Sequence, residues 1–389
     1  MGTSIAAATI KGGLPVLITD ADPDALAAAP AKVAADLTET DGPPDPQAEG
    51  LVARLLEPTT EAARIAACDL VLESVVENPA VKHEVYAGLE PLMRPEAILA
   101  TNTSAIPIGR LAAGLARPGA FCGVHFCHPV RRRPLVEIVR GPQSAPATIA
   151  AVVAYACAIG KIPVVVDDGP GFLVNRLLAP YLNGALDLLL EGAGIEEVDQ
   201  AMSQFGMAMG PLRMIDEVGI DTSMQGGRVL RDAFPQRVLP SPLLVSMVKA
   251  GRFGRKSGAG FYVYPAGTGR DDPGQPDPGA RNLVSNWVRT PRPHSPEAIV
   301  HRLLLPTVLE ATRILEEKRV RDAGEIDLTM IFGLGFPAAR GGLLYWADTL
   351  GASQIIELLE PFSPLGELAQ PTPLLLEMAR DGRRFYGST

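Results

Sequence analysis

The sequence predicts an α/β domain with a mainly parallel, doubly wound sheet, followed by duplicated all-α domains. Short apolar segments alternate with helical ones up to about Asp168, which is the pattern of a sheet with crossover helices. From Gly169 onward, apolar residues recur at helical spacing. Two of these later helical segments share one register, which indicates an internal repeat.

Six short apolar segments are expected to form the strands of the first domain, separated by helices and turns. They are residues 15–20, 68–77, 97–102, 121–126, 134–139 and 162–167. Asp22 and Pro23 predict the start of a helix that continues to about Leu37, because Asp is a common N-cap and Pro suits the first turn. Pro, Gly and Asp predict a loop over residues 39–47, and a further helix is expected from Asn78.

The two helical domains are predicted from matching positions. The matching pairs are Arg176 and Arg302, Pro180 and Pro306, Asp199 and Asp327, and Phe205-Gly206 and Phe332-Gly333. Their offsets stay between 126 and 128 residues, which is hard to obtain by chance. We therefore expect helical domains at 169–265 and 294–389, packed together. Gly, Pro and Asp are frequent at 266–282, so a linker is expected over 266–293.

Composition excludes several classes of protein. The 389 residues carry a formal net charge of −9, which argues against a nucleic-acid-binding surface. The basic run Arg131 to Arg133 is either a solvated turn or a local phosphate contact. The longest uncharged stretch, 145–160, falls short of the ~20 apolar residues of a membrane span, so we expect a buried helix. No signal peptide is recognisable at Met1, and a cytoplasmic protein is expected.

The four cysteines form no CxxC pair and have no zinc-ligand spacing, so we expect no metal site. We interpret them as small core residues in a reducing compartment. They are Cys68, Cys122, Cys127 and Cys157.

Polar residues at predicted strand ends are the candidate site residues, because ligands of such sheets bind at the carboxyl ends of the strands. Asp20 could hold ribose hydroxyls of a dinucleotide or be an ordinary turn acid. Ser104 could bind a ligand or cap a helix that begins near Ile108. Gly2 could be the tail of a G-x-G-x-x-G turn, which is a weak signal when it stands alone.

A histidine and a carboxylate add possible acid–base chemistry. His125 ends one strand and Glu137 lies within the next, and a carboxylate can orient a histidine that acts as general base. A histidine that simply packs in the core remains the alternative. Asn175 lies in the first turns of a long helix just after the predicted domain junction. Its amide could reach a cleft between domains or face solvent.

Taken together, a series of stretches resembles the L-3-hydroxyacyl-CoA dehydrogenase family, and in particular the dehydrogenase half of the multifunctional fatty-acid oxidation α subunits. They occur in the family's order over almost the whole chain: VVENPAVK, ATNTSAIPI, FCGVHFCHPV, PLVEIVRG, DDGPGFLVNRLL, FGMAMGP, GRFGRKSGAGFY and FGLGFP.

The resemblance implies a Rossmann-like NAD-binding domain over 1–168 and oxidation of an L-3-hydroxyacyl-CoA substrate to 3-oxoacyl-CoA. His125 would be the general base, Glu137 would stabilise its charged form, and Ser104 and Asn175 would bind the substrate oxygen. The implied NAD-binding residues are Gly2, Asp20, Val76, Glu77, Lys82, Ser104 and His128. A thiolase subunit or an enoyl-CoA hydratase is implied as a partner.

Three departures from the family pattern affect these expectations. His128 stands where the family has Asn, and Phe332 stands where close relatives have Tyr. The chain also begins at the last two residues of the glycine fingerprint. We therefore expect a fragment whose sheet lacks its first strand and whose NAD binding is poor.

Two alternatives to an active dehydrogenase remain. One is a non-catalytic acyl-CoA-binding or scaffold module of a β-oxidation complex, which the missing strand would favour. The other is a different NAD enzyme with a related helical domain, such as a 6-phosphogluconate or UDP-sugar dehydrogenase. The second fits less well, because it does not account for the HFCHP and PLVEIV segments.

Overall fold

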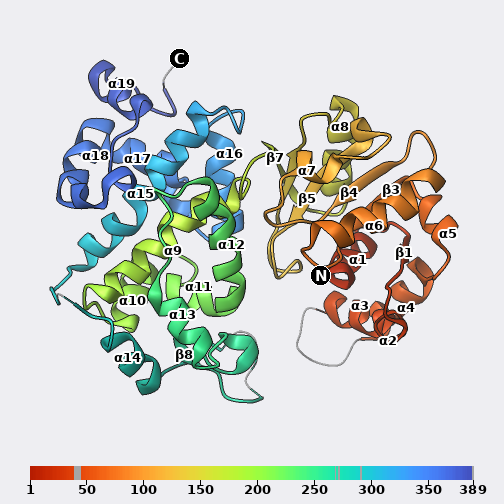
Figure 1. The fold of residues 1–389 in the computed structure, drawn as a ribbon, viewed down its shortest axis with the longest axis horizontal. Coiled ribbons are helices and arrows are strands. Elements are labelled where there is room, and N and C mark those ends of the chain that lie inside the picture. The colour runs from red at the N-terminus through yellow and green to blue at the C-terminus, as the bar shows by residue number, and fades with distance from the viewer. Residues whose placement is uncertain (39–44, 268, 270–271, 290, 388–389) are drawn as a thin grey trace. The chain divides into compact units, whose positions relative to one another are not determined.

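The chain folds into two compact units, Met1–Phe172 and Leu173–Thr389. A computed structural model describes residues 1–38, 45–267, 269, 272–289 and 291–387. The first unit contains the strands β1–β7 and the second is mainly helical (Figure 1).

The strands of the first unit form two sheets where a single one was expected. Their bounds are β1 Val16–Ile18, β2 Leu56–Pro58, β3 Leu70–Glu73, β4 Ile98–Thr101, β5 Phe121–Phe126, β6 Leu135–Arg140 and β7 Ile162–Asp167. β1 and β2 form a parallel pair, and the larger sheet has the order β3-β4-β5-β6-β7. All neighbours in the larger sheet are parallel except β5 and β6, which are antiparallel. The expected mainly parallel sheet is therefore confirmed, but β1 and β2 are separated from it as a second sheet.

Helices cover both faces of the larger sheet, which confirms the doubly wound arrangement. The helices of this unit are α1 Gly2–Lys11, α2 Pro23–Ala27, α3 Ala29–Leu37, α4 Pro46–Leu55, α5 Ala62–Ala66, α6 Pro79–Leu89, α7 Ile108–Ala112 and α8 Pro146–Ala158, with 3₁₀ turns η1 Glu90–Leu92 and η2 Pro118–Ala120. One face of β5 packs in a core that includes residues of α8, among them Val152. On the opposite face, Tyr86 of α6 packs edge-on against Phe121, with ring centroids 5.4 Å apart.

Gly123 of β5 permits α7 to pack closely against the sheet. A Cβ at this position would lie 2.6 Å from the side chain of Ile108 and 2.9 Å from that of Val139. Such distances are too short for any side chain, so only glycine suits this strand position.

The helix α1 connects the cores of the two sheets. Ile5 belongs to the core of the larger sheet, whereas Ala6, Ala7 and Ile10 pack with α3 and α4 beneath the smaller one. The apolar residues of α1 therefore hold the two parts of the interrupted sheet together by side-chain packing.

Several sequence-based boundaries need correction. The helix expected from Asp22 to Leu37 is divided into α2 and α3, because Pro30 lies in the first turn of α3 and cannot continue the hydrogen bonding of α2. Asp22 is an N-cap as predicted, since its side chain accepts a bond from the Asp24 amide. The strand expected over 68–77 ends at Glu73, where the carboxylate accepts a bond from the Val75 amide. Strand β2 was not predicted.

The segment 39–47 was expected to be a loop, but its last two residues are helical. Residues 39–44 lie outside the described residues, and Pro46 and Gln47 already belong to α4, which Asp45 caps.

Cys122 and Cys127 are buried as expected, but Cys157 is exposed and Cys68 is only partly buried. Burial raises the pKa of both buried thiols to about 12.

The second unit is built from eleven helices of the described chain and one short strand pair. They are α9 Val174–Leu190, α10 Ile195–Phe205, α11 Pro211–Val218, α12 Ile220–Ala233, α13 Pro242–Lys249, α14 Pro278–Ser285, α15 Pro296–Glu316, α16 Ala323–Leu328, α17 Leu343–Leu350, α18 Ala352–Leu359 and α19 Pro373–Asp381, with β8 Tyr262–Val263 and β9 Gln275–Pro276. Further helical segments are the 3₁₀ segments η3 Arg255–Ser257, η5 Ala338–Arg340 and η6 Glu360–Leu368, and the π-helical segment η4 Thr329–Gly333. None of the described helices is long and apolar enough to cross a membrane.

The matching positions Asp199 and Asp327 make the same kinds of contact. The carboxylate of Asp199 accepts bonds from the first amides of α11 and from the Tyr262 hydroxyl. The carboxylate of Asp327 does the same with α17 and the Tyr386 hydroxyl. Burial raises the pKa of both carboxyls, that of Asp199 to about 6. These equivalent contacts support the internal repeat.

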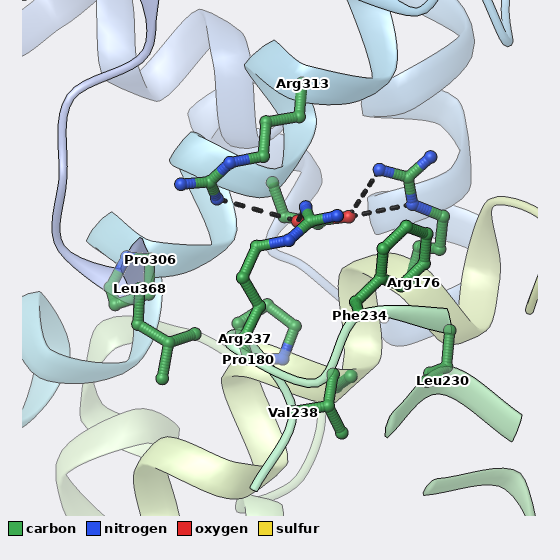
Figure 2. Close-up of a pocket in the computed structure, with 11 residues that line it drawn as sticks. Arg176, Pro180, Leu230, Phe234, Arg237, Val238, Pro306, Arg313 and Leu368 are labelled. Carbon is green, nitrogen blue, oxygen red and sulfur yellow. Dashed lines mark hydrogen bonds and ion pairs between the residues drawn. The ribbon is translucent and has the colours of Figure 1, made fainter. Parts of the chain in front are cut away.

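The long helices α9 and α15, which carry the matching Arg176 and Arg302, pack against each other around a buried ion cluster (Figure 2). Arg176 donates to Glu310 at 2.7 Å and to Glu317 at 2.6 Å, and Arg237 donates to Glu310 at 2.6 Å. Arg313 lies 3.6 Å from the same carboxylate. Three guanidinium groups therefore share the single charge of Glu310.

The segment 266–293, expected as a linker, contains ordered elements. Strand β9 pairs with β8, and α14 begins after Asp277, whose side chain accepts a bond from the Gly279 amide and pairs with Arg252. Local capping thus produces a helix despite the high Pro and Gly content.

Candidate active site

The carboxyl ends of β3, β4 and β5 are joined by Asn102. Its amide nitrogen donates to the Ser74 hydroxyl at 3.3 Å, and its side-chain oxygen accepts a bond from the Phe126 amide at 3.0 Å. These contacts hold the three strand ends in one arrangement, at the edge where ligands of parallel sheets bind. Asn102 belongs to the TNTS segment, but sequence reasoning did not single it out.

His125 and Glu137 form a hydrogen-bonded pair across β5 and β6. The two residues lie directly opposite each other in the antiparallel register, which places their side chains on the same face. Nδ1 of His125 is 2.5 Å from Oε2 of Glu137, whose carboxylate accepts the bond. The Glu137 side chain is completely buried and that of His125 is 13% exposed. Because Glu137 holds Nδ1, Nε2 is the nitrogen through which this imidazole can exchange a proton with a bound molecule.

Glu77 holds the loop that contains Ser104. Its Oε1 accepts bonds from the Thr103 hydroxyl at 2.6 Å, the Ser104 amide at 2.9 Å and the Ser104 hydroxyl at 3.2 Å. The Ala105 amide is a further donor at 3.3 Å. Glu77, which was predicted to contact NAD, is thus in direct contact with Ser104, which was predicted to bind the substrate oxygen.

Asp168 caps the helix after this loop. Its carboxylate accepts bonds from the Ile108 and Gly109 amides at 2.8 and 2.7 Å, at the start of α7. Capping by Ser104, the alternative left open by the sequence, is therefore wrong. A carboxylate sixty residues away takes that role, which no local pattern reveals.

Lys82 lies inside the fold. Its side chain is completely buried, and its ammonium group is 2.8 Å from Glu73 and 3.6 Å from Glu77. The predicted contact of Lys82 with NAD remains a prediction. Glu73, and the residues Thr101 and Tyr86 whose hydroxyls donate to it, were not predicted as site residues.

The other predicted cofactor residues lie at strand and helix ends of the first unit. Gly2 is the first residue of α1, whose N-terminal amides have no side-chain cap. Asp20 is exposed after β1 and accepts a bond from the Asp22 amide, as a turn acid would. Val76 follows β3 and is 66% exposed. An uncapped helix N-terminus and exposed apolar residues beside a strand end fit a dinucleotide, which has both phosphates and flat rings.

The turn that carries His128 is held by partly buried polar contacts. His128 is exposed in the connection between β5 and β6. Lys161 donates to the carbonyls of Val130 and Arg133 at 2.5 and 2.9 Å, and Arg131 donates to the Thr38 carbonyl at 3.2 Å. The Arg131 contact makes at least this arginine more than a solvated residue.

Asn175 belongs to the other unit. It is partly buried in the first turn of α9, next to the buried Arg176. Ser104, His125 and Glu137 lie in the first unit, so the structure brings three of the four predicted catalytic residues into one unit.

A doubly wound unit with a histidine–carboxylate pair, joined to a helical unit, is an arrangement typical of dinucleotide-dependent oxidoreductases. Residues 1–169 match the family model "3-hydroxyacyl-CoA dehydrogenase, NAD binding domain", and residues 171–264 match "3-hydroxyacyl-CoA dehydrogenase, C-terminal domain". The chain belongs to the 3-hydroxyacyl-CoA dehydrogenase family.

The chain is also similar in sequence to individual curated proteins. Fatty acid oxidation complex subunit alpha of Pseudomonas aeruginosa is 42% identical over 338 residues, which are 85% of this chain and 47% of that protein. The chain thus spans about half the length of the curated relatives that it matches.

Solved structures are similar to nearly the whole chain or to about two thirds of it. 3-Hydroxybutyryl-CoA dehydrogenase of Escherichia coli K12 is 25% identical, with a TM-score of 0.82 over 98% of this chain and 96% of that one. (S)-3-hydroxybutyryl-CoA dehydrogenase of Ralstonia eutropha is 35% identical, with a TM-score of 0.63 over 68% of this chain and 95% of that one.

Proposed function

We propose that the protein catalyses the NAD-dependent oxidation of an L-3-hydroxyacyl-CoA to the 3-oxoacyl-CoA in fatty-acid β-oxidation. The observation that carries this proposal is the contact between His125 and Glu137, which are opposite each other in the strand register. Family membership supports the substrate class. The absence of a membrane-spanning helix from the described residues is compatible with the cytoplasmic location that we also propose.

In the proposed mechanism, Nε2 of His125 takes the proton from the 3-hydroxyl of the substrate. Glu137 holds Nδ1 and supplies the negative charge that stabilises the resulting imidazolium. The Ser104 hydroxyl, fixed by Glu77, orients the substrate oxygen, and Asn175 is the second proposed ligand of that oxygen. NAD, when bound, accepts the hydride from C3 of the substrate. We propose that Gly2, Asp20, Val76, Glu77, Lys82 and His128 serve its binding.

NADH consumption in the presence of a 3-oxoacyl-CoA tests this function. We expect the absorbance of NADH to fall only when both the protein and the 3-oxoacyl-CoA are present. If the substrate causes no loss of absorbance although the protein binds NADH and acyl-CoA, the proposal is wrong.

A second candidate function is a non-catalytic acyl-CoA-binding or scaffold module. The division of the strands into two separate sheets favours it, because a dinucleotide binds at the carboxyl ends of the strands of one sheet, where the strand order reverses. A titration of NADH fluorescence distinguishes the two functions. A scaffold module would bind acyl-CoA without binding NADH.

The name of the Pseudomonas relative, a subunit of a fatty acid oxidation complex, also supports a partner subunit for this protein. A thiolase subunit or an enoyl-CoA hydratase would use the product or supply the substrate of the proposed reaction. Copurification with the tagged chain, followed by assay of both activities, tests this association.

Asp20 provides a test of cofactor choice. We expect Asp20→Ser to shift the preference for NADH over NADPH by about tenfold toward NADPH, because a carboxylate at this position repels the 2′-phosphate. Dissociation constants of both nucleotides should be measured, with Asp24→Ser in the following helix as control. An unchanged ratio in Asp20→Ser would show that this residue is only a turn acid.

A further inference from the structure

Glu73 is a buried carboxylate at the end of β3, 4% exposed, with a donor at every side. Its oxygens accept bonds from Lys82 at 2.8 Å, from the Tyr86 and Thr101 hydroxyls at 2.8 Å each, and from the Val75 amide at 2.6 Å. The mechanism proposed above does not use this group. A carboxylate so fully bonded in the interior is held in one position, and it also holds its partners.

Lys82 connects Glu73 to a second carboxylate. Its side chain is completely buried, and the ammonium group lies between Glu73 at 2.8 Å and Oε2 of Glu77 at 3.6 Å. The ammonium group therefore balances two carboxylates at once. Removing the charge of Glu73 would leave Glu77 as the remaining carboxylate beside a buried cation, and the cation would then attract Glu77 more strongly.

The two carboxylate oxygens of Glu77 contact different partners. Oε2 faces Lys82, whereas Oε1 accepts all the bonds from Thr103, Ser104 and Ala105. A rotation of this carboxylate toward Lys82 would take Oε1 away from the Ser104 amide and hydroxyl. The position of Ser104 therefore depends on Glu73, through Lys82 and Glu77.

We propose that Glu73 is a positioning residue for Ser104, acting through Lys82 and Glu77. Its role in catalysis rests on the proposed function, in which Ser104 binds the substrate oxygen. The chain of contacts itself does not depend on that function. Glu73 and Lys82, which are both buried, thereby determine the position of the Ser104 hydroxyl, the proposed ligand of the substrate oxygen.

Hydrogen exchange in Glu73→Gln and Lys82→Met tests the proposal without relying on activity. We expect the amides of Ser104 and Ala105 to exchange at least about tenfold faster than in the unsubstituted protein. In Glu73→Gln their acceptor Glu77 is drawn toward Lys82, and in Lys82→Met it loses the cation that faces its second oxygen. The amides should exchange little faster in the double variant than in either single variant, since both substitutions break the same chain of contacts. Amides of β6, such as that of Ile138, should keep their protection.

Two controls separate positioning from loss of stability. Asp69→Asn removes an exposed ion pair with Arg94 at the start of β3. Val152→Ala makes a cavity in the core of the same unit. Neither should change the exchange of the Ser104 amide, even where Val152→Ala lowers the melting temperature as much as Glu73→Gln does.

The activity assay adds the catalytic part of the proposal. We expect kcat with a 3-oxoacyl-CoA to fall by at least about tenfold in both variants, more than KM rises. Faster exchange at Ser104 without a loss of kcat would overturn the positioning role. Unchanged exchange in Glu73→Gln would overturn the proposal whatever the activity, and Lys82→Met decides the same question if Glu73→Gln does not fold. If the unsubstituted protein is inactive, the proposed function fails, while the exchange data still decide the contact chain.

Discussion

Replacing His125 by alanine is expected to lower the rate of NADH consumption with a 3-oxoacyl-CoA by about 10²–10⁴-fold, the usual contribution of a general acid or base. In this direction of the reaction, the imidazolium gives its proton to the developing alkoxide. Alanine leaves no group on β5 that can do so. The rate should be measured at saturating substrate by the loss of NADH absorbance.

The alanine variant also leaves the buried Glu137 without its partner, so loss of structure must be separated from loss of chemistry. His125→Gln retains an amide that can donate to Glu137 but cannot transfer a proton at neutral pH. We expect the same loss of rate, about 10²–10⁴-fold, in both variants, and we expect His125→Gln to keep the NADH affinity and melting temperature of the unsubstituted protein. Equal rates in His125→Ala and the unsubstituted protein would exclude the assigned role.

Glu310→Gln is expected to destabilise the helical unit by about 3–5 kcal/mol, the cost of breaking a buried ion pair from one side. The substitution removes the charge shared by Arg176, Arg237 and Arg313, and the Arg176 side chain is only 3% exposed (Figure 2). Burial, together with the neighbouring Arg237, already lowers the pKa of Arg313. Without Glu310, this crowding of positive charge would increase.

The two tryptophans of the chain, Trp287 and Trp346, both lie in the helical unit, so urea unfolding followed by their fluorescence reports on that unit. Glu377→Gln is the matched control, because its pair with Arg383 is about half exposed on both sides and should contribute less than about 1 kcal/mol. A similar unfolding midpoint for both variants would mean that Glu310 does not hold α9 and α15 together.

The antiparallel pairing of β5 and β6 was not predicted, although the sequence contains the signal. Only eight residues, 127–134, connect the two strands, and a parallel crossover needs a dozen or more. This short connection determines that β6 runs back beside β5. The register of the pair then places Glu137 opposite His125, which turns two separate candidate residues into one pair.

Contacts between distant residues set the limit of sequence reasoning at the site. Ser104 was located at a strand end correctly, but its contact with Glu77 and the capping of α7 by Asp168 depend on how β3, β4 and β7 assemble. Glu73 was hidden for the same reason. It lies within an apolar strand pattern, and the donors that make its burial possible come from α6 and β4.

The repeat was easier to predict, because matching positions preserve their spacing in the chain. Asp199 and Asp327 were identified from their offset alone, and the structure gives them equivalent contacts. The ordered part of the predicted linker was missed because composition outweighed one capping residue, Asp277. A local signal was present for both features. The constant offset predicted the repeat, whereas the single capping residue was given less weight than the Gly and Pro content of the linker.

The most direct measurement of the central claim compares the two enantiomers of a 3-hydroxyacyl-CoA in the presence of NAD. A base and a hydroxyl ligand fixed on β5 and the loop after β4 can align only one configuration at C3 for proton and hydride removal. We predict NADH formation from the L enantiomer and none above background from the D enantiomer. Equal rates with both enantiomers, or no NADH from either while NAD and acyl-CoA bind, would contradict this account.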